Sequence, residues 1–235
     1  MKNHILFGTL ALLVGSLLAA NAAPKDDLTA AAKKLADKDN YSWKQKTENA
    51  SGGGFGGGTG EGKTEKDGCL WLSMTMRDNT IEAVKKGEKG AIKTQDGWQS
   101  LSEATSGDPG PVTFLARRLQ NFKSPAAQAE ELAGKVKELK QDGDVYSGEL
   151  TEEGAKSQLM FGGRGGGNGP EISGAKGSVK FWVKDGLLSK YEVKVQGKVS
   201  FNGNDRDVDR TTTIEIKDIG STKVEVPDDA KKKLS

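Results

Sequence analysis

The alternation of apolar and polar residues over residues 179–199 limits the fold of this chain more than any other feature. Val179, Phe181 and Val183 alternate with a second face formed by Lys180, Trp182 and Lys184, and the same period of two returns after an Asp-Gly pair. A period of two is that of a β-strand, whose successive side chains point to opposite faces. The pattern therefore predicts an antiparallel hairpin with one buried face, which carries Phe181, Val183, Tyr191, Val193, Val195 and Val199.

Several other segments show the same alternation. Tyr41 and Trp43 alternate with polar residues, and shorter strands are expected over 80–103, 211–217 and 223–226. Residues 70–76 predict a strand with one apolar face, formed by Leu70, Leu72, Met74 and Met76. Because the chain is only 34% apolar and contains 32 glycines, it cannot bury both faces of so many strands. An antiparallel sheet with a single covered face is expected.

A few short segments have the helical period instead. Leu28, Ala31, Ala32 and Leu35 form one stripe after two aspartates. Pro111 and Ser124-Pro125 are typical helix starts, and each precedes an apolar stripe. Thr151 is expected to cap a further short helix, and residues 228–233 a closing helical turn. Helices placed in this way would cover one face of the sheet or cross its opening.

The N-terminal segment, residues 1–22, has the pattern of a secretory signal peptide. Lys2 precedes an apolar run over residues 5–20, and Ala20-Asn21-Ala22 offers a cleavage site. A retained membrane anchor is the alternative, although the run is shorter than the roughly 20 apolar residues that a span needs. Cleavage would leave residues 23–235 as a single domain without a transmembrane anchor, located in the periplasm or secreted.

Two glycine-rich tracts, residues 52–62 and 162–169, are expected to be flexible loops because glycine loses the most backbone entropy on folding. The first contains a letter-for-letter match to the phosphate-binding pattern GxxxxGK[ST], which starts at Gly57 and ends at Thr64. That pattern holds phosphate only between a hydrophobic strand and a helix N-terminus. Here polar residues precede it and a strand pattern follows. The tract is therefore expected to be a loop at the rim of the sheet that binds no nucleotide.

Common catalytic and metal-binding arrangements are excluded by composition. The only histidine, His4, leaves with the signal peptide, so a Ser-His-Asp triad and histidine-ligated metal sites are ruled out. The single cysteine, Cys69, cannot form an internal disulfide and is expected to be a small, half-buried strand residue. No cofactor is predicted, and the chain is not expected to be an enzyme, although carboxylate chemistry stays open.

Charge patterns do not indicate a metal or a nucleic acid. Asp205, Asp207 and Asp209 have the spacing of a calcium loop, but Arg210 and Ile216 stand where that loop needs glycine and glutamate. A charged turn between two strands is expected there, and no metal site. Lysine and arginine number 35 against 33 aspartates and glutamates, so no overall attraction to nucleic acid follows.

Parts of the sequence resemble one known superfamily. The segments "GAIKTQDGWQSL", "GSVKFWVKDGLLSKYEVKVQGKVSF" and "TTTIEIKDIGSTKVEVPDDA" resemble strands of the outer-membrane lipoprotein carrier superfamily, which includes the LolA-like and LppX/LprG-like periplasmic proteins. "DVYSGELTEEGA" is similar to the segment that precedes those strands in the LppX/LprG-like group. The resemblance implies an α+β fold, in which an incomplete antiparallel β-barrel, a strongly curved sheet, wraps around a few helices. This chain differs in its glycine tracts and in lacking the lipid-attachment cysteine of the LppX/LprG-like proteins.

Two functions follow as hypotheses. In the first, which the resemblance favours, the protein carries a lipid, a lipoprotein acyl chain or another hydrophobic ligand in a groove between sheet and helices. The expected lining comprises Trp43, Leu70, Leu72, Met74, Met76, Phe181, Val183, Tyr191, Val193 and Val195. In the second, the same residues fill a core, and the protein is a structural or interaction module with a partner protein of the cell envelope. Apolar lining is common to cores and pockets, so the sequence leaves both open.

Overall fold

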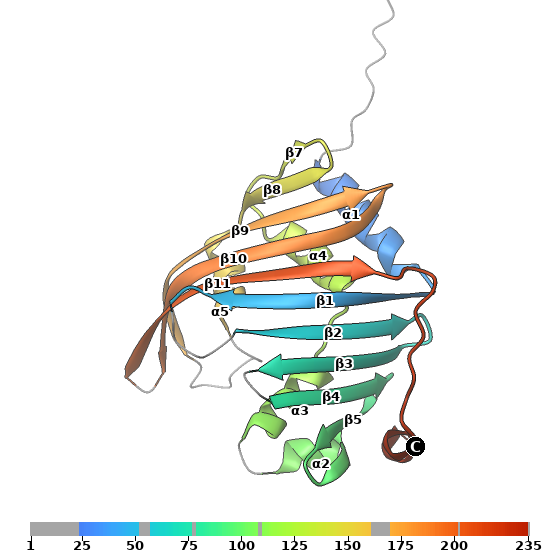
Figure 1. The fold of residues 1–235 in the computed structure, drawn as a ribbon. Helices are drawn as coiled ribbons and strands as arrows, with labels where there is room; N and C mark the ends of the chain where they lie inside the picture. The colour runs from blue at the N-terminus through green and yellow to red at the C-terminus, as the bar shows by residue number, and fades with distance from the viewer. Residues whose placement is uncertain are drawn as a thin grey trace, which may run out of the picture.

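The computed structural model describes residues 24–51, 57–76, 79–107, 110–160, 170–201 and 203–234. Within these ranges the chain forms one sheet of eleven strands and six helices (Figure 1). The first six strands are β1 (Asn40–Asn49), β2 (Gly58–Glu65), β3 (Cys69–Met76), β4 (Asn79–Lys86), β5 (Lys89–Thr94) and β6 (Gly97–Ser100). The other five are β7 (Lys140–Asp142), β8 (Val145–Glu149), β9 (Glu171–Lys184), β10 (Leu187–Phe201) and β11 (Asn204–Lys217). The signal-peptide prediction and the tract at 162–169 lie outside the described residues.

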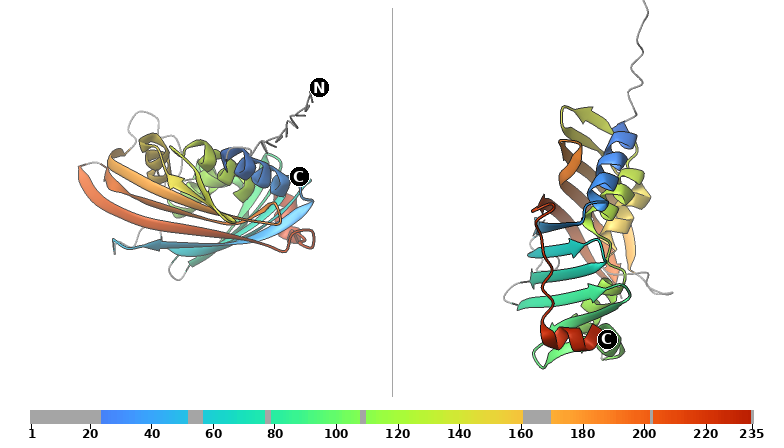
Figure 2. Two further views of the ribbon diagram at one scale, coloured as in Figure 1. Left: turned by 90° about the horizontal axis from the view of Figure 1, so that it is seen from above. Right: turned by 90° about the vertical axis from the view of Figure 1, so that its right-hand side faces the viewer.

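The sheet consists of two antiparallel meanders joined in the middle. Strands β1 to β6 pair in chain order, as do β7 to β11, and β1 pairs with β11 to connect the two sets. Strands β6 and β7 are the two edges, so the sheet stays open. Figure 2 shows that it is strongly curved, with helices along its inner side. The prediction of an α+β fold built on an incomplete antiparallel barrel is confirmed.

The helices divide into groups that cover different parts of the sheet. Toward β9 and β10 lie α1 (Pro24–Ala36), α4 (Pro125–Gly134) and α5 (Glu152–Leu159). Toward β5 lie α2 (Leu101–Ser106) and α3 (Pro111–Gln120). The predicted starts at Pro111, Ser124 and Thr151 are confirmed, and the side chains of Ser124 and Thr151 each accept a backbone N–H three residues on. Apolar inner-face residues of both strand sets form one core with these helices.

The C-terminal segment differs from its prediction. Residues 223–226 were expected to form an edge strand, but they form no strand, and the N–H of Val224 instead donates to Glu65 Oε1 at 2.8 Å. Helix α6 (Asp228–Leu234) follows and buries Ala230 against Val84 and Ala91 on the outer face of the sheet. The segment is therefore held by a small second core rather than by strand pairing. Part of the outer face of the sheet is thus covered by α6 instead of being exposed to solvent.

Two other segments were assigned wrongly from their polarity. Residues 205–210 were expected to be a charged turn, yet they belong to β11, where Asp205 pairs with Lys198 of β10 across the strands. Cross-strand ion pairs and hydrogen bonds offset the polarity of such a strand. Residues 101–103 were expected to continue a strand, but they belong to α2, which begins at a capping box made by Ser100 and Glu103.

The first glycine tract is also not a loop along its described length. Residues 58–65 form β2, which lies in the sheet between β1 and β3 and pairs with both. Gly58, Gly60 and Gly62 recur at every second position, so glycine occupies the inner face of this strand up to Thr64. The phosphate-binding match therefore ends inside a strand and not at a helix N-terminus, which leaves it without the geometry that holds phosphate. Residues 52–56 lie outside the described part.

Candidate functional site

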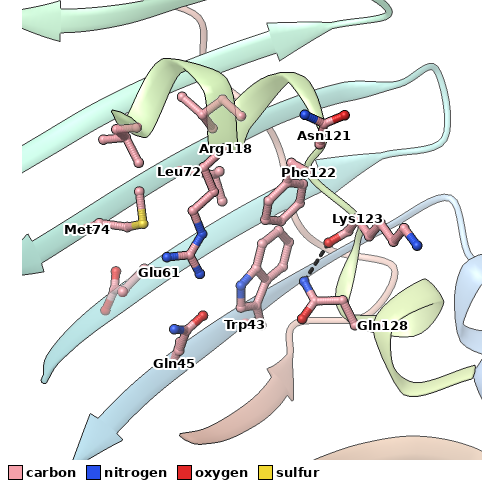
Figure 3. Close-up of a pocket in the computed structure, with 13 residues that line it drawn as sticks. Trp43, Gln45, Glu61, Leu72, Met74, Arg118, Asn121, Phe122, Lys123 and Gln128 are labelled. Carbon is pink, nitrogen blue, oxygen red and sulfur yellow. Dashed lines mark hydrogen bonds between the residues drawn. The ribbon is translucent and has the colours of Figure 1, made fainter. Parts of the chain in front are cut away.

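A hollow lies over β1, β2 and β3, between the two groups of inner helices. Its volume is about 230 Å³. Figure 3 shows α3 and the segment after it passing above these strands, with side chains from both sides turned toward the space between. The lining residues are Trp43, Gln45, Gly60, Glu61, Leu72, Met74, Leu115, Arg118, Leu119, Asn121, Phe122, Lys123 and Gln128.

The hollow exists because β2 has glycine, with no side chain, at its inward positions 58, 60 and 62. At Gly62 a Cβ atom would lie 2.0 Å from the indole of Trp43, so the ring rests directly on the β2 backbone. At Gly60 a Cβ atom would meet Met74 Cγ at 3.6 Å and Ser73 O at 3.3 Å. Any larger side chain at these two positions would fill space that the indole and the hollow now occupy.

Aromatic and aliphatic side chains form the apolar part of the pocket. The indole of Trp43 is stacked against the ring of Phe122, with centroids 6.0 Å apart and planes inclined by 16°. Leu72 from β3 and Leu115 and Leu119 from α3 are buried beside these rings. Met74 is only partly buried and lines the pocket from β3. Together these groups offer a flat and a flexible apolar surface to a ligand.

Most of the charged residues around the pocket already have partners. Lys123 Nζ lies 2.6 Å from Glu131 Oε2, and the Lys123 carbonyl accepts a bond from Gln128 Nε2 at 2.6 Å. Glu61 Oε1 lies 3.3 Å from Lys44 Nζ. Since Glu61 alternates with the inward glycines of β2, this ion pair lies on the outer face.

Arg118 is different from these paired residues. Figure 3 shows its guanidinium extending from α3 into the pocket, toward Trp43 and Gln45. The side chain is exposed to solvent by its accessible area, yet burial among protein atoms lowers the pKa of the guanidinium. Both descriptions fit a cation that lines a hollow: water reaches it, while protein surrounds it on several sides.

The ten residues expected to line a ligand groove are divided between the pocket and the core. Trp43, Leu72 and Met74 are among the lining residues. Val183 is partly buried and packs on the core, and the side chain of Met76 lies outside the described residues. The rest are in the closed core, with at most 7% of their surface exposed: Leu70, Phe181, Tyr191, Val193 and Val195.

Sequence reasoning missed the residues that come from α3 and the segment after it. The apolar stripe of α3 was visible in the sequence, but the stripe does not say which strands it crosses. The inward glycines of β2 were the available signal, because a period of two runs through them just as it does through the apolar strands. The high glycine content of residues 52–62 instead led to the prediction of a flexible loop.

Two buried tyrosines near the pocket differ in the hydrogen bonding of their hydroxyl groups. Tyr191 donates from its hydroxyl to Gln128 Oε1 at 3.3 Å. The Tyr41 hydroxyl is buried and has no hydrogen-bond partner of good geometry in the described part of the chain. Burial raises the pKa of Tyr41, a change that nearby Ser124 and Ala126 oppose. Ser124 and Ala126 are thus close to the hydroxyl without satisfying it.

Replacing Tyr41 by phenylalanine is expected to stabilise the protein by up to about 1 kcal/mol, since it removes an unsatisfied buried hydroxyl. Tyr191→Phe is expected to cost about 1 kcal/mol, because the Gln128 oxygen loses its donor. Urea unfolding followed by circular dichroism measures both variants. An equal loss of stability in the two would mean that the Tyr41 hydroxyl does have a partner in solution.

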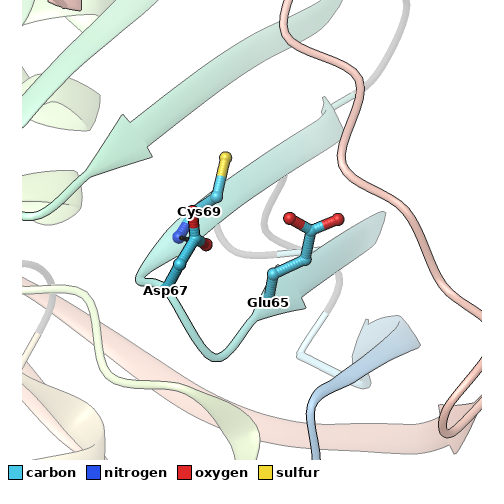
Figure 4. Close-up of side chains that lie close together, drawn as sticks. All are labelled: Glu65, Asp67 and Cys69. Atoms are coloured by element: carbon cyan, nitrogen blue, oxygen red, sulfur yellow. Dashed lines mark hydrogen bonds between the residues drawn. The ribbon is translucent and has the colours of Figure 1, made fainter.

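A second group of side chains lies together at the β2–β3 turn. Potential ligand atoms of Glu65, Asp67 and Cys69 are within 4.8 Å of one another (Figure 4). Asp67 accepts the Cys69 N–H at 3.0 Å and pairs with Lys86 at 3.1 Å, interactions that lower its pKa. Glu65 accepts the Val224 N–H, and burial raises the pKa of the Cys69 thiol. These groups shape the turn and fix the C-terminal segment.

The fold and the pocket define an α+β protein with an open, curved antiparallel sheet that holds an amphipathic hollow against its helices. None of the helices in the ranges described above has the length and apolar character that crossing a bilayer requires. No protein family profile and no curated protein matches the sequence.

Solved structures with a similar fold include two mycobacterial proteins. LprF from Mycobacterium bovis is 12% identical, with 88% of this chain and 97% of that chain covered and a TM-score of 0.47. The lipoprotein LppX from Mycobacterium tuberculosis is 13% identical, with 87% and 98% covered and a TM-score of 0.48. A LolA superfamily protein from Nitrosomonas europaea is 9% identical, with 88% and 96% covered and a TM-score of 0.34.

Proposed function

We propose that this protein binds the hydrophobic part of an amphiphile, such as a single acyl chain, in the pocket over β1–β3, and catalyses no reaction. The observation that carries the proposal is the glycine-faced strand β2, which leaves a hollow beside buried aromatic and aliphatic side chains. Burial of apolar ligand surface there would contribute roughly 25 cal/mol per Å². The sequence resemblance to lipoprotein carriers supports the same ligand class.

The size of the pocket limits what it can hold. At about 230 Å³ it is larger than the ~150 Å³ cavity that binds one benzene, and smaller than the roughly 300–1,000 Å³ of pockets for drug-sized ligands. One acyl chain, with part of its length outside the hollow, fits this volume better than a lipid with several chains. Methionine and leucine side chains around the hollow could adapt to such a chain.

The alternative function, a structural or interaction module of the cell envelope, is favoured by a different observation. Most of the inner face is a filled core, in which Phe181, Tyr191 and Val195 are almost fully buried. A protein of this kind would take up no ligand and would instead be recovered with a specific envelope protein after crosslinking. Both functions accord with an exported chain, which we propose from the N-terminal signal-peptide pattern.

Uptake of a dansyl-labelled fatty acid by the purified mature chain, together with native mass spectrometry after gentle purification, tests the proposal. We expect saturable enhancement of the dansyl fluorescence with one ligand per chain. We also expect the emission of Trp43 to transfer energy to the probe, so a Trp43→Phe variant should lose part of this transfer. A protein that stays ligand-free in both measurements would contradict the proposal and favour the structural module.

A further inference from the structure

The pocket contains a positive charge that the neighbouring protein does not neutralise. Among the residues that the structure describes, Arg118 makes no ion pair with a carboxylate, whereas the other pocket cation, Lys123, is paired with Glu131. The carboxylate of Glu61 is directed to the outer face, where it meets Lys44. Among the described lining residues, the side chains that face inward thus include a guanidinium and no carboxylate. An arginine in such a place is suited to a carboxylate or a phosphate, which its planar fork can bind with two hydrogen bonds.

A second arginine adds to the positive character of this end of the inner face. Arg210 of β11 donates to the carbonyl of Gln158, at the end of α5. Burial, and then the nearby charge of Arg118, lower its pKa to about 10. The adjacent acid along the strand, Asp209, alternates to the outer face, where it accepts a bond from Gln196 at 2.8 Å. Two like charges are therefore held close together inside the curved sheet.

The strand residues between the two arginines are polar, although they lie on the inner face. Gln45 Nε2 donates to Thr47 Oγ1 at 3.3 Å, and Thr47 Oγ1 lies 3.3 Å from Thr212 Oγ1. Gln45 also lines the pocket directly. The inner face consequently changes character along β1, from the aromatic pair formed by Trp43 and Phe122 to a polar and cationic stretch that begins at Gln45.

We propose that the pocket binds an amphiphile with an acidic head group, a carboxylate or a phosphate monoester, and that Arg118 and Gln45 hold this head group while the chain lies along Trp43 and Leu72. This inference rests on the proposed function, since it names the chemistry of the ligand for the same pocket. The head group would supply the negative charge that the pocket lacks and would relieve the repulsion between Arg118 and Arg210.

Isothermal titration of the wild type and three variants with palmitate, hexadecanol and inorganic phosphate tests this inference. Palmitate and hexadecanol have the same chain length and differ in charge. Arg118→Gln is expected to weaken palmitate binding about tenfold or more, the effect of losing one charged hydrogen bond, and to leave hexadecanol binding unchanged. Arg118→Lys should recover part of the affinity. Arg117→Gln is the matched control, because Arg117 is an exposed arginine of the same helix that does not line the pocket.

The other possible outcomes of the titration distinguish a failure of the head-group assignment from a failure of the proposed function. If Arg118→Gln weakens palmitate and hexadecanol equally, Arg118 acts on the structure of the pocket, and the inference is overturned. If the variant binds palmitate as the wild type does, the proposed function stands and the head-group assignment fails. If inorganic phosphate binds as tightly as palmitate, the site is one for free anions. If the wild type binds neither long-chain compound, the proposed function fails as well.

Discussion

Gly62→Ala is expected to lower the free energy of unfolding by about 1–3 kcal/mol, the usual cost of overpacking a closed site. The added methyl carbon would lie 2.0–2.5 Å from three atoms of the Trp43 indole. That ring is 4% exposed and stacked on Phe122, so it can yield only by breaking the stacking or by entering the pocket. Both movements remove packing that the wild type has. Ligand uptake is expected to fall in parallel, since the indole forms part of the pocket wall.

Gly60→Ala is the matched control for this prediction. It makes the same chemical change on the same face of the same strand, but its methyl carbon would meet its nearest neighbour, Ser73 O, at 3.3 Å. A shift of a few tenths of an ångström accommodates that contact, and alanine loses less backbone entropy than glycine, so the net change should stay within about 1 kcal/mol. Urea unfolding followed by circular dichroism compares the two. Equal stabilities would show that the indole is not held closely against β2.

The alternation of apolar and polar residues predicted the strands of the sheet well wherever one face of a strand is apolar. The hairpin of β9 and β10 was predicted around Asp185-Gly186, and both of these residues have positive φ, as a tight hairpin turn requires. The prediction failed where a strand gains its stability from neighbours instead of from its own composition. Strand β2 has glycine at its inward positions 58, 60 and 62 and polar residues elsewhere, and it is stabilised by pairing on both sides and by the indole of Trp43.

The pocket could be predicted only in part, for a geometric reason. The sequence identified Trp43, Leu72 and Met74 as inner-face residues, and they do face the hollow. It gave no means of separating them from Phe181 or Tyr191, which have the same pattern and are fully packed. That difference depends on where α3 and α4 cross the sheet and on the missing side chains of β2. This difference arises from tertiary packing, which the apolar–polar periodicity of a single strand or helix does not encode.

Met74→Trp is expected to abolish ligand uptake, with at least a tenfold loss of affinity for the dansyl-labelled fatty acid, and to leave the stability of the protein unchanged or raised. Met74 lies on the inner face of β3 and is only partly buried, with the hollow beside it. An indole at this position would occupy the space of the ligand and would gain packing contacts that the empty hollow does not provide. Opposite effects on binding and stability are the signature of a pocket that is maintained for a ligand.

Ser73→Trp adds the same ring one residue earlier in β3, on the outer face, and should leave uptake as it is in the wild type. Fluorescence titration gives the affinities, and thermal unfolding gives the stabilities. If Met74→Trp is too unstable to measure, Met74→Phe introduces a smaller ring at the same place. Continued uptake by either folded Met74 variant would place the ligand elsewhere on the protein. A gain in stability without any uptake by the wild type would instead favour the structural module, because the hollow would then be only a packing defect between α3 and the inward glycines of β2.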